Sequence, residues 1–241
     1  MIMALAMAAC APKQPAEATT EAPATTEAPA TEAPATEADD GVMSHEEFVA
    51  AEMDSEVTVE TYIQAKQSWW DNKATFYTQN EDGAYFLYEM PCTEEEYNKL
   101  VEGTKIRVTG FKSEWGGEVE ITEAKFEILD GSFVAEPLDV TAFLADKDQL
   151  LTHQNEKIAV KGLTVNAISY KNDEPGDDIY LTLDLDGASY NFCVEFYLTG
   201  TETEVYKTVC ELKAGDVVDV EAYLYWYEDA ANPHITSVVV K

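Results

Sequence analysis

One stretch of this chain occurs twice, and the duplication limits the possible folds more than any other feature. Residues 100–128 read LVEGTKIRVTGFKSEWGGEVEITEAKFEI, and residues 212–240 read LKAGDVVDVEAYLYWYEDAANPHITSVVV. Each copy contains the end of a predicted helix, a glycine (Gly103 or Gly215), an alternating strand, an aromatic turn and a second alternating strand. The sequence therefore predicts two similar domains built from one duplicated unit.

The elements that precede each copy predict the kind of domain. Alternating segments at 57–63, 75–78 and 84–90 predict three strands, and Thr93 with Glu96 predicts a helix that begins in a capping box. The second unit repeats this order: strands at 157–169, 179–185 and 190–198 precede a helix capped by Thr201 with Glu204. Three strands, a helix and two strands is the order of the OB-fold, a five-stranded Greek-key barrel.

We therefore predict an all-β chain with minor α content: two tandem five-stranded OB-fold-like barrels, each with a helix between strands 3 and 4. The first OB-like domain spans 44–137 and begins with a helix that Ser44 caps and whose apolar stripe is Phe48, Val49 and Met53. Residues 138–154 form a helical connector beside or between the barrels, and the second OB-like domain spans 155–241. In the two inserted helices we expect the following residues to face inward: Tyr97, Leu100, Val101, Val205, Val209 and Leu212.

The N-terminal residues have a different composition. Residues 1–10 are apolar and end in Met7-Ala8-Ala9-Cys10, which resembles the lipobox of bacterial lipoproteins and implies lipidation at Cys10. No Lys or Arg precedes the apolar run, and a plain apolar start remains the alternative. Residues 11–43, almost entirely Ala, Pro, Thr and Glu as far as residue 38, predict a disordered, extended stalk.

The charge of the chain is strongly negative. Asp and Glu number 47 against 15 Lys and Arg, which gives a formal net charge of -32. Because nucleic-acid binding depends on Lys and Arg that release counterions from phosphates, this balance predicts no nucleic-acid partner. It allows neutral or cationic ligands.

Three segments carry a resemblance to a known group of proteins. VETYIQAKQSWWDNKATFY, AYFLYEMPCTEEEYNKL and AYLYWYEDAANPHITSVVVK resemble uncharacterised tandem OB-fold-like lipoproteins of Gram-positive bacteria, from about Ser44 to the end of the chain. The resemblance implies the fold and an extracytoplasmic, membrane-anchored location. It carries no catalytic residues.

Aromatic residues in loops are the main candidates for a ligand site. OB-folds bind ligands on the face of strands 2 and 3 and at the loops that join strands 1 to 2 and 4 to 5. Flat aromatic faces stack on sugar rings. The alternative is that these rings pack the barrel ends or the two domains together. The candidates are Trp69, Trp70, Trp115, Tyr170, Tyr225, Trp226 and Tyr227.

Other chemistry has little support in the sequence. Cys193 and Cys210 could form a disulfide or be two buried small side chains, and the acidic loop 172–178 could hold Ca²⁺ or be a solvated loop. His45, His153 and His234 are scattered, without metal-site spacing, and no motif for nucleophilic catalysis or phosphate binding is present. We expect no metal, no cofactor and no enzymatic activity.

Together these patterns predict a lipid-anchored extracytoplasmic binding module for a carbohydrate or a cell-surface protein, held to the membrane through a lipid on Cys10. The alternative is a structural or accessory subunit of a cell-envelope protein complex.

Overall fold

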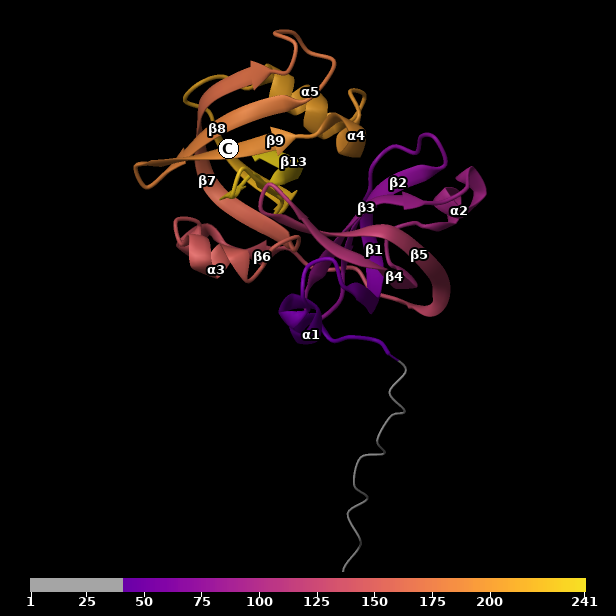
Figure 1. The fold of residues 1–241 in the computed structure, drawn as a ribbon. Helices are drawn as coiled ribbons and strands as arrows, with labels where there is room; N and C mark the ends of the chain where they lie inside the picture. Colours follow the sequence, from indigo (N-terminus) through magenta and orange to yellow (C-terminus); the bar gives the residue numbers. More distant parts are fainter. Residues whose placement is uncertain (1–40) are drawn as a thin grey trace, which may run out of the picture. The chain divides into compact units, whose positions relative to one another are not determined.

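The computed structural model describes residues 41–241 (Figure 1). The predictions for the lipobox, for Cys10 and for stalk residues 11–40 lie outside the described residues. The chain is mostly β. Its first sheet comprises β1 (Glu56–Lys66), β2 (Lys73–Gln79), β3 (Ala84–Pro91), β4 (Thr104–Trp115) and β5 (Glu118–Ser132).

These five strands form a closed barrel in the order β1-β2-β3-β5-β4. All neighbours are antiparallel except β3 and β5, which pair in parallel. Helix α2 (Glu94–Lys99) lies between β3 and β4 in the sequence. Strand number, closure and helix position agree with an OB-fold-like barrel, so this prediction is confirmed for the first unit.

Local sequence explains the elements of the first barrel. Val57, Val59 and Ile63 on β1 are fully buried and begin the core, as period-two alternation requires. At α2 the Thr93 hydroxyl accepts a hydrogen bond from the backbone N–H of Glu96, and the Glu96 carboxylate accepts one from the backbone N–H of Thr93. This is the predicted capping box.

Three apolar side chains that the sequence assigned to the inward faces of helices are exposed instead. Leu100 is buried, but Val101 is exposed because α2 ends at Lys99 and the chain turns there. The leading helix α1 (His45–Ala50) has the expected Ser44 cap, and it buries only Phe48. Val49 is exposed, and so is Met53, which lies beyond the end of the helix.

The second sheet contains six strands in the order β10-β13-β9-β8-β7-β6, and β10 pairs with β7 as well. The β6–β7 and β13–β9 pairs are parallel. A two-stranded hairpin, β11 with β12, extends from the end of β10. The strands are β6 (Leu138–Asp139), β7 (Lys157–Tyr170), β8 (Ile179–Leu185), β9 (Ala188–Val194), β10 (Val217–Tyr223), β11 (Trp226–Tyr227), β12 (Ala230–Ala231) and β13 (His234–Val240).

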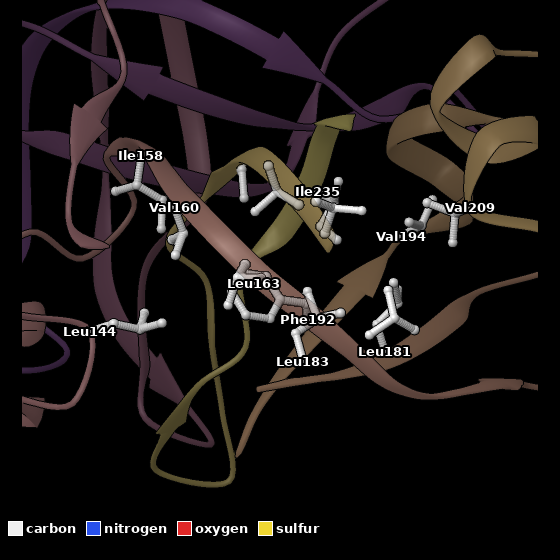
Figure 2. Packing of buried hydrophobic residues seen from close by; sticks show 14 of the residues in the cluster. Leu144, Ile158, Val160, Leu163, Leu181, Leu183, Phe192, Val194, Val209 and Ile235 are labelled. Carbon is white, nitrogen blue, oxygen red and sulfur yellow. The ribbon is translucent and has the colours of Figure 1, made fainter. Parts of the chain in front are cut away.

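The connector belongs to the second unit. Its first residues form β6, which was not predicted, and it continues through the short 3₁₀ turn η1 (Thr141–Phe143) and α3 (Lys147–Leu151). Val140, Leu144 and Leu150 are buried in the same apolar cluster as residues of β7 to β10 and β13. Figure 2 shows Leu144 facing this cluster together with Ile158, Val160, Leu163 and Phe192.

The segment after β9 differs from the prediction. The strand ends at Val194, because the Glu195 carboxylate accepts hydrogen bonds from the backbone N–H groups of Tyr197 and Leu198 and starts a short helix, α4 (Phe196–Thr199). The next helix, α5 (Glu204–Glu211), is capped by Thr203. The predicted cap at Thr201 is therefore wrong, since the extra turn of helix moves the start of α5 along the chain.

The two sheets contact each other through aromatic side chains. The described residues, 41–241, belong to one compact unit. Tyr77 and Phe86 of β2 and β3 pack with Tyr223 of β10 in a third buried cluster. The Tyr77 hydroxyl is hydrogen-bonded to His234 Nδ1 at 2.6 Å. The β2–β3 face of the first barrel, where an OB-fold is expected to bind ligands, is therefore partly covered by the second unit.

The three cysteines within residues 41–241 are not bridged. Cys92, Cys193 and Cys210 are free thiols, so the disulfide considered for Cys193 and Cys210 does not form. Within the described part of the chain, no helix has both the length and the apolar character needed to cross a membrane.

Candidate ligand-binding cleft

Three of the seven predicted aromatic residues stabilise the fold. Trp226 is 1% exposed, lies in the core of the second unit and cannot touch a ligand in this structure. Trp69 packs against the first core and donates a hydrogen bond from Nε1 to the carbonyl oxygen of Cys92 at 2.9 Å. Tyr170 packs against the second core. For these rings, the packing alternative describes the structure.

Trp70 is exposed but is separate from the other candidates. It precedes the turn residues Asp71 and Asn72 between β1 and β2, both of which have positive φ, and it forms a bridge with Lys73. The Lys73 ammonium nitrogen lies 4.3 Å from the centroid of the indole ring. This cation–π contact occupies one face of the ring.

Trp115 and Tyr227 meet at the tips of two hairpins. Their ring centroids are 5.5 Å apart, and the residues are 57% and 41% exposed. Each ring belongs to the last residue before a two-residue turn, Gly116-Gly117 in one hairpin and Glu228-Asp229 in the other, and all four turn residues have positive φ. The two residues occupy the same position in the two copies of the duplicated segment. Trp115 follows Gly103 at the same sequence distance at which Tyr227 follows Gly215.

The backbones of these two tips are also in contact. The backbone N–H of Asp229 donates to the carbonyl oxygen of Gly116 at 2.9 Å. A Cβ atom on Gly117 would lie 3.0 Å from the Cα atom of Asp229, so only glycine allows this approach without a shift. The duplicated hairpins are therefore packed tip to tip, with one exposed aromatic ring from each.

Two cavities lie beside the paired rings. The smaller, of about 260 Å³, is lined by residues of the first barrel, including Tyr88 and Glu120, and by residues of the second unit. The larger, of about 810 Å³, extends over β8 and β9 and includes Tyr227. Both cavities are lined by Trp115, Glu195, Tyr225 and His234. We call the two cavities together the aromatic cleft; the volume of the larger cavity is that of a small-molecule site.

Tyr225 and His234, which line both cavities, form an uncharged aromatic stack. Tyr225 stacks on His234 with ring centroids 4.3 Å apart, and its edge contacts Phe86 at 5.4 Å. Burial lowers the pKa of His234 to about 3, so the imidazole is uncharged at neutral pH and has one donor and one acceptor nitrogen. Tyr225 thus contributes one ring to both the inter-unit contact and the cleft.

Two carboxylates of the cleft, Glu120 and Glu195, have raised pKa values. Glu120 is 7% exposed, and burial, with a smaller contribution from the neighbouring Glu89, raises its pKa to about 7. Glu195 accepts hydrogen bonds from two backbone N–H groups, at 3.1 and 2.7 Å, yet burial still raises its pKa to about 7. Both groups can therefore be ionised near neutral pH and can accept hydrogen bonds from a ligand.

A third carboxylate braces the hairpins from behind. Glu118 is fully buried and accepts hydrogen bonds from the backbone N–H of Trp226 at 2.9 Å and from Gln154 Nε2 at 3.3 Å. Burial raises the pKa of Glu118 to about 8. This residue joins the start of β5 to both the second hairpin and the connector, so it holds the two rims of the cleft in register.

The cleft carries more negative than positive charge. Lys171 lines the larger cavity, but its ammonium group is paired with Asp177 at 3.1 Å and Asp178 at 3.0 Å. The same pairs neutralise part of the acidic loop 172–178, which had been considered for Ca²⁺. Within residues 41–241 no group of three or more His, Cys, Asp or Glu side chains is arranged to hold a metal ion.

The sequence did not indicate Tyr88, Glu120 or Glu195 as parts of a site. Alternation along β5 places Glu120 on the face opposite Ile121, which would be the solvent-facing side of an isolated barrel. It is buried only because the second unit covers that face. No local pattern contains this information, because it depends on how the two units dock.

Comparisons with known proteins give limited information. No protein-family model matches the chain. No curated protein matches it either. Among solved structures, a murine DNA-binding protein bound to double-stranded DNA is similar, with a TM-score of 0.38 and 9% identity over 76% of this chain and 94% of that chain.

A replication protein A heterotrimer bound to single-stranded DNA has a TM-score of 0.31 and 13% identity, covering 76% of this chain and 49% of that chain. Asparaginyl-tRNA synthetase from Pyrococcus horikoshii has a TM-score of 0.29 and 20% identity; the match covers 35% of this chain and spans only 19% of the synthetase chain. At these identities, the likenesses concern the fold alone.

One prediction is corrected by these comparisons. The net charge was taken to exclude nucleic acid, yet similar solved structures include a protein bound to double-stranded DNA and one bound to single-stranded DNA. The exclusion is contradicted and is not retained. Overall charge is a poor guide here, because a ligand meets the local charge of one face and not the total of the chain.

Proposed function

We propose that this protein is an extracytoplasmic binding module, anchored to the membrane by a lipid on Cys10 and built from two tandem OB-fold-like barrels. The pairing of β10 with both β13 and β7 supports a second closed barrel, made of β7, β8, β9, β13 and β10. Helix α5, between β9 and β10, occupies the same place in the order as α2 in the first barrel.

The ligand of the aromatic cleft is proposed to be a carbohydrate. The observation that carries this proposal is the pair of exposed rings, Trp115 and Tyr227, at the rim of a cleft that also contains buried carboxylates. Exposed indole and phenol faces can stack on the apolar faces of sugar rings. Carboxylates such as Glu195 can accept hydrogen bonds from sugar hydroxyl groups, and their fixed positions reduce the entropy lost on binding.

The proposal is tested by glycan-array binding followed by titration of tryptophan fluorescence. We expect the wild-type protein to bind at least one oligosaccharide, Trp115→Ala to lose the binding, and Trp70→Ala to retain it. Trp70 is a matched control because it is 53% exposed, compared with 57% for Trp115, but does not line the cleft. Silence of the wild type on the array, with no fluorescence change, would overturn the carbohydrate proposal.

A second candidate function, a structural or accessory subunit of a cell-envelope complex, is favoured by a different surface. An apolar groove of about 480 Å³ between α1 and α3 includes the exposed side chains of Val49, Met53 and Leu151. Exposed apolar patches of this kind often contact other proteins. Recovery of a stoichiometric partner from membranes by the wild type, but not by a Val49→Asp, Leu151→Asp double variant, supports this function; a purely monomeric protein argues against it.

A further inference from the structure

Glu120 has no polar partner among the residues that the structure describes, 41–241. The residue is 7% exposed and lines the smaller cavity of the aromatic cleft. Its carboxylate makes no hydrogen bond and no ion pair within residues 41–241. Buried carboxylates are normally paired or hydrogen-bonded, because their removal from water is unfavourable. The neighbouring acid, Glu89, is paired with Lys73 at 2.7 Å. Glu120 is thus a desolvated acceptor that faces a cavity.

The surroundings of Glu120 favour a cation in that cavity. The carboxylate of Glu195 lines both cavities, and the carboxylates of Asp178 and Glu228 line the larger cavity. Among residues 41–241, the one ammonium group that lines either cavity is that of Lys171, and it is paired with two aspartates. The faces of Trp115, Tyr88 and Tyr225 add negative quadrupole potential, which attracts ammonium groups.

We infer that the saccharide proposed for this cleft is an amino sugar whose free ammonium group pairs with the Glu120 carboxylate. This inference rests on the proposed carbohydrate function and specifies the substrate class of the same site. A free ammonium group of the ligand supplies the hydrogen-bond donors and the opposite charge that residues 41–241 do not provide for the Glu120 carboxylate. An N-acetylated amine is uncharged and offers the Glu120 carboxylate only one neutral amide N–H, which is a weaker partner than an ammonium group.

The test compares a glucosamine trimer with its fully N-acetylated counterpart by isothermal titration at pH 7. We expect the wild-type full chain to bind the free-amine trimer at least ~10-fold more tightly, a difference of ~1.4 kcal/mol. Glu120→Gln keeps the shape of the side chain and removes its charge, so it should bind both trimers with similar affinity. Glu114→Gln removes an exposed carboxylate from the same hairpin, outside the cleft, and should keep the preference.

The outcomes separate this inference from the proposed function. Equal binding of the two trimers to the wild type, or an unchanged preference in Glu120→Gln, overturns the amino-sugar inference and leaves carbohydrate binding intact. Absence of binding to any saccharide overturns both. Binding of trilysine without binding of the glucosamine trimer also overturns the inference, in favour of a basic peptide. The comparison on the wild type needs no variant, so it can overturn the inference even if Glu120→Gln does not fold.

Discussion

The two copies of the duplicated hairpin use their aromatic residues differently. In the first copy a single indole, Trp115, precedes a Gly-Gly turn and is exposed. In the second, Tyr227 stands at the same position and is exposed too, while Trp226 is buried and Tyr225 is half-buried against His234. The copies therefore keep one exposed ring each. The second copy adds Tyr225, which contacts Phe86 of the first barrel, and Trp226, which is buried in the core of the second unit.

This comparison separates two roles that look alike in the sequence. Aromatic residues near a hairpin turn can hold the hairpin down or form a surface, and composition does not distinguish these roles. Their order relative to the turn does: the last residue before the turn is exposed in both copies. The predictions below test this separation.

The largest expected effect is the contrast between the two tryptophans of the hairpins. Trp226→Ala removes the largest fully buried side chain and should lower the free energy of unfolding by ~3–5 kcal/mol. Trp115→Ala removes an exposed ring and should change it by less than ~0.5 kcal/mol. Urea denaturation measures both values. Similar losses in the two variants would contradict the assignment of separate roles.

The next effect is a pH dependence that comes from Glu118. Its pKa in the folded protein is about 8, above its ordinary value of 4.5, so the folded state binds more protons than the unfolded state between these values. The contribution of Glu118 to stability is therefore fully present below about pH 4.5 and is lost as pH rises toward 8. Glu118→Gln cannot ionise, and its stability relative to the wild type should rise by roughly 2–4 kcal/mol between pH 5 and 8.

Urea midpoints of both proteins across this pH range provide the measurement for Glu118. The control is Glu114→Gln, which changes an exposed carboxylate on the same hairpin and should parallel the wild type. Parallel curves for Glu118→Gln and the wild type are incompatible with a buried, raised-pKa carboxyl that braces the hairpins.

A smaller effect is expected where the two units meet. Tyr77→Phe removes the hydroxyl that is hydrogen-bonded to His234 Nδ1 and leaves a buried polar nitrogen without a partner, which should cost ~1–3 kcal/mol. Tyr88→Phe serves as control. Because Tyr88 is exposed, removal of its hydroxyl should lower the stability less than in Tyr77→Phe. Thermal unfolding of the two variants gives the difference, and a near-neutral Tyr77→Phe would argue against a tight contact between the units.

The smallest effect concerns the contact between the hairpin tips. Gly117→Ala and Gly187→Ala both place a side chain at positive φ, +89° and +83°, which costs ~1 kcal/mol or somewhat more. Only the Cβ at Gly117 would also meet the backbone of Asp229, at 3.0 Å; nothing lies within 4 Å of one at Gly187. Gly117→Ala should therefore be the more destabilised variant, and equal melting temperatures would show that the tips are not packed.

The sequence predicted the elements better than their assembly. The capping box at Thr93 and the strand at residues 179–185 depend on a few neighbouring residues, and both are present. The cap at Thr203 and the strand β6 were missed, because they depend on a turn formed by Glu195 and on pairing with a distant strand. The site follows the same rule: Trp115 and Tyr227 were identified, but Glu120 becomes buried only through docking of the units.

The central claim is that the aromatic cleft, and no other tryptophan-bearing surface, binds the ligand. The chain contains 4 tryptophans, so a nitrogen–proton correlation NMR spectrum separates their indole N–H signals and a saccharide titration reports on each. We predict that the Trp115 signal shifts strongly, while the signals of buried Trp226, half-buried Trp69 and exposed Trp70, none of which lines either cavity of the cleft, stay in place. A shift confined to Trp70, or an unchanged Trp115 signal under saturating saccharide, would contradict the claim.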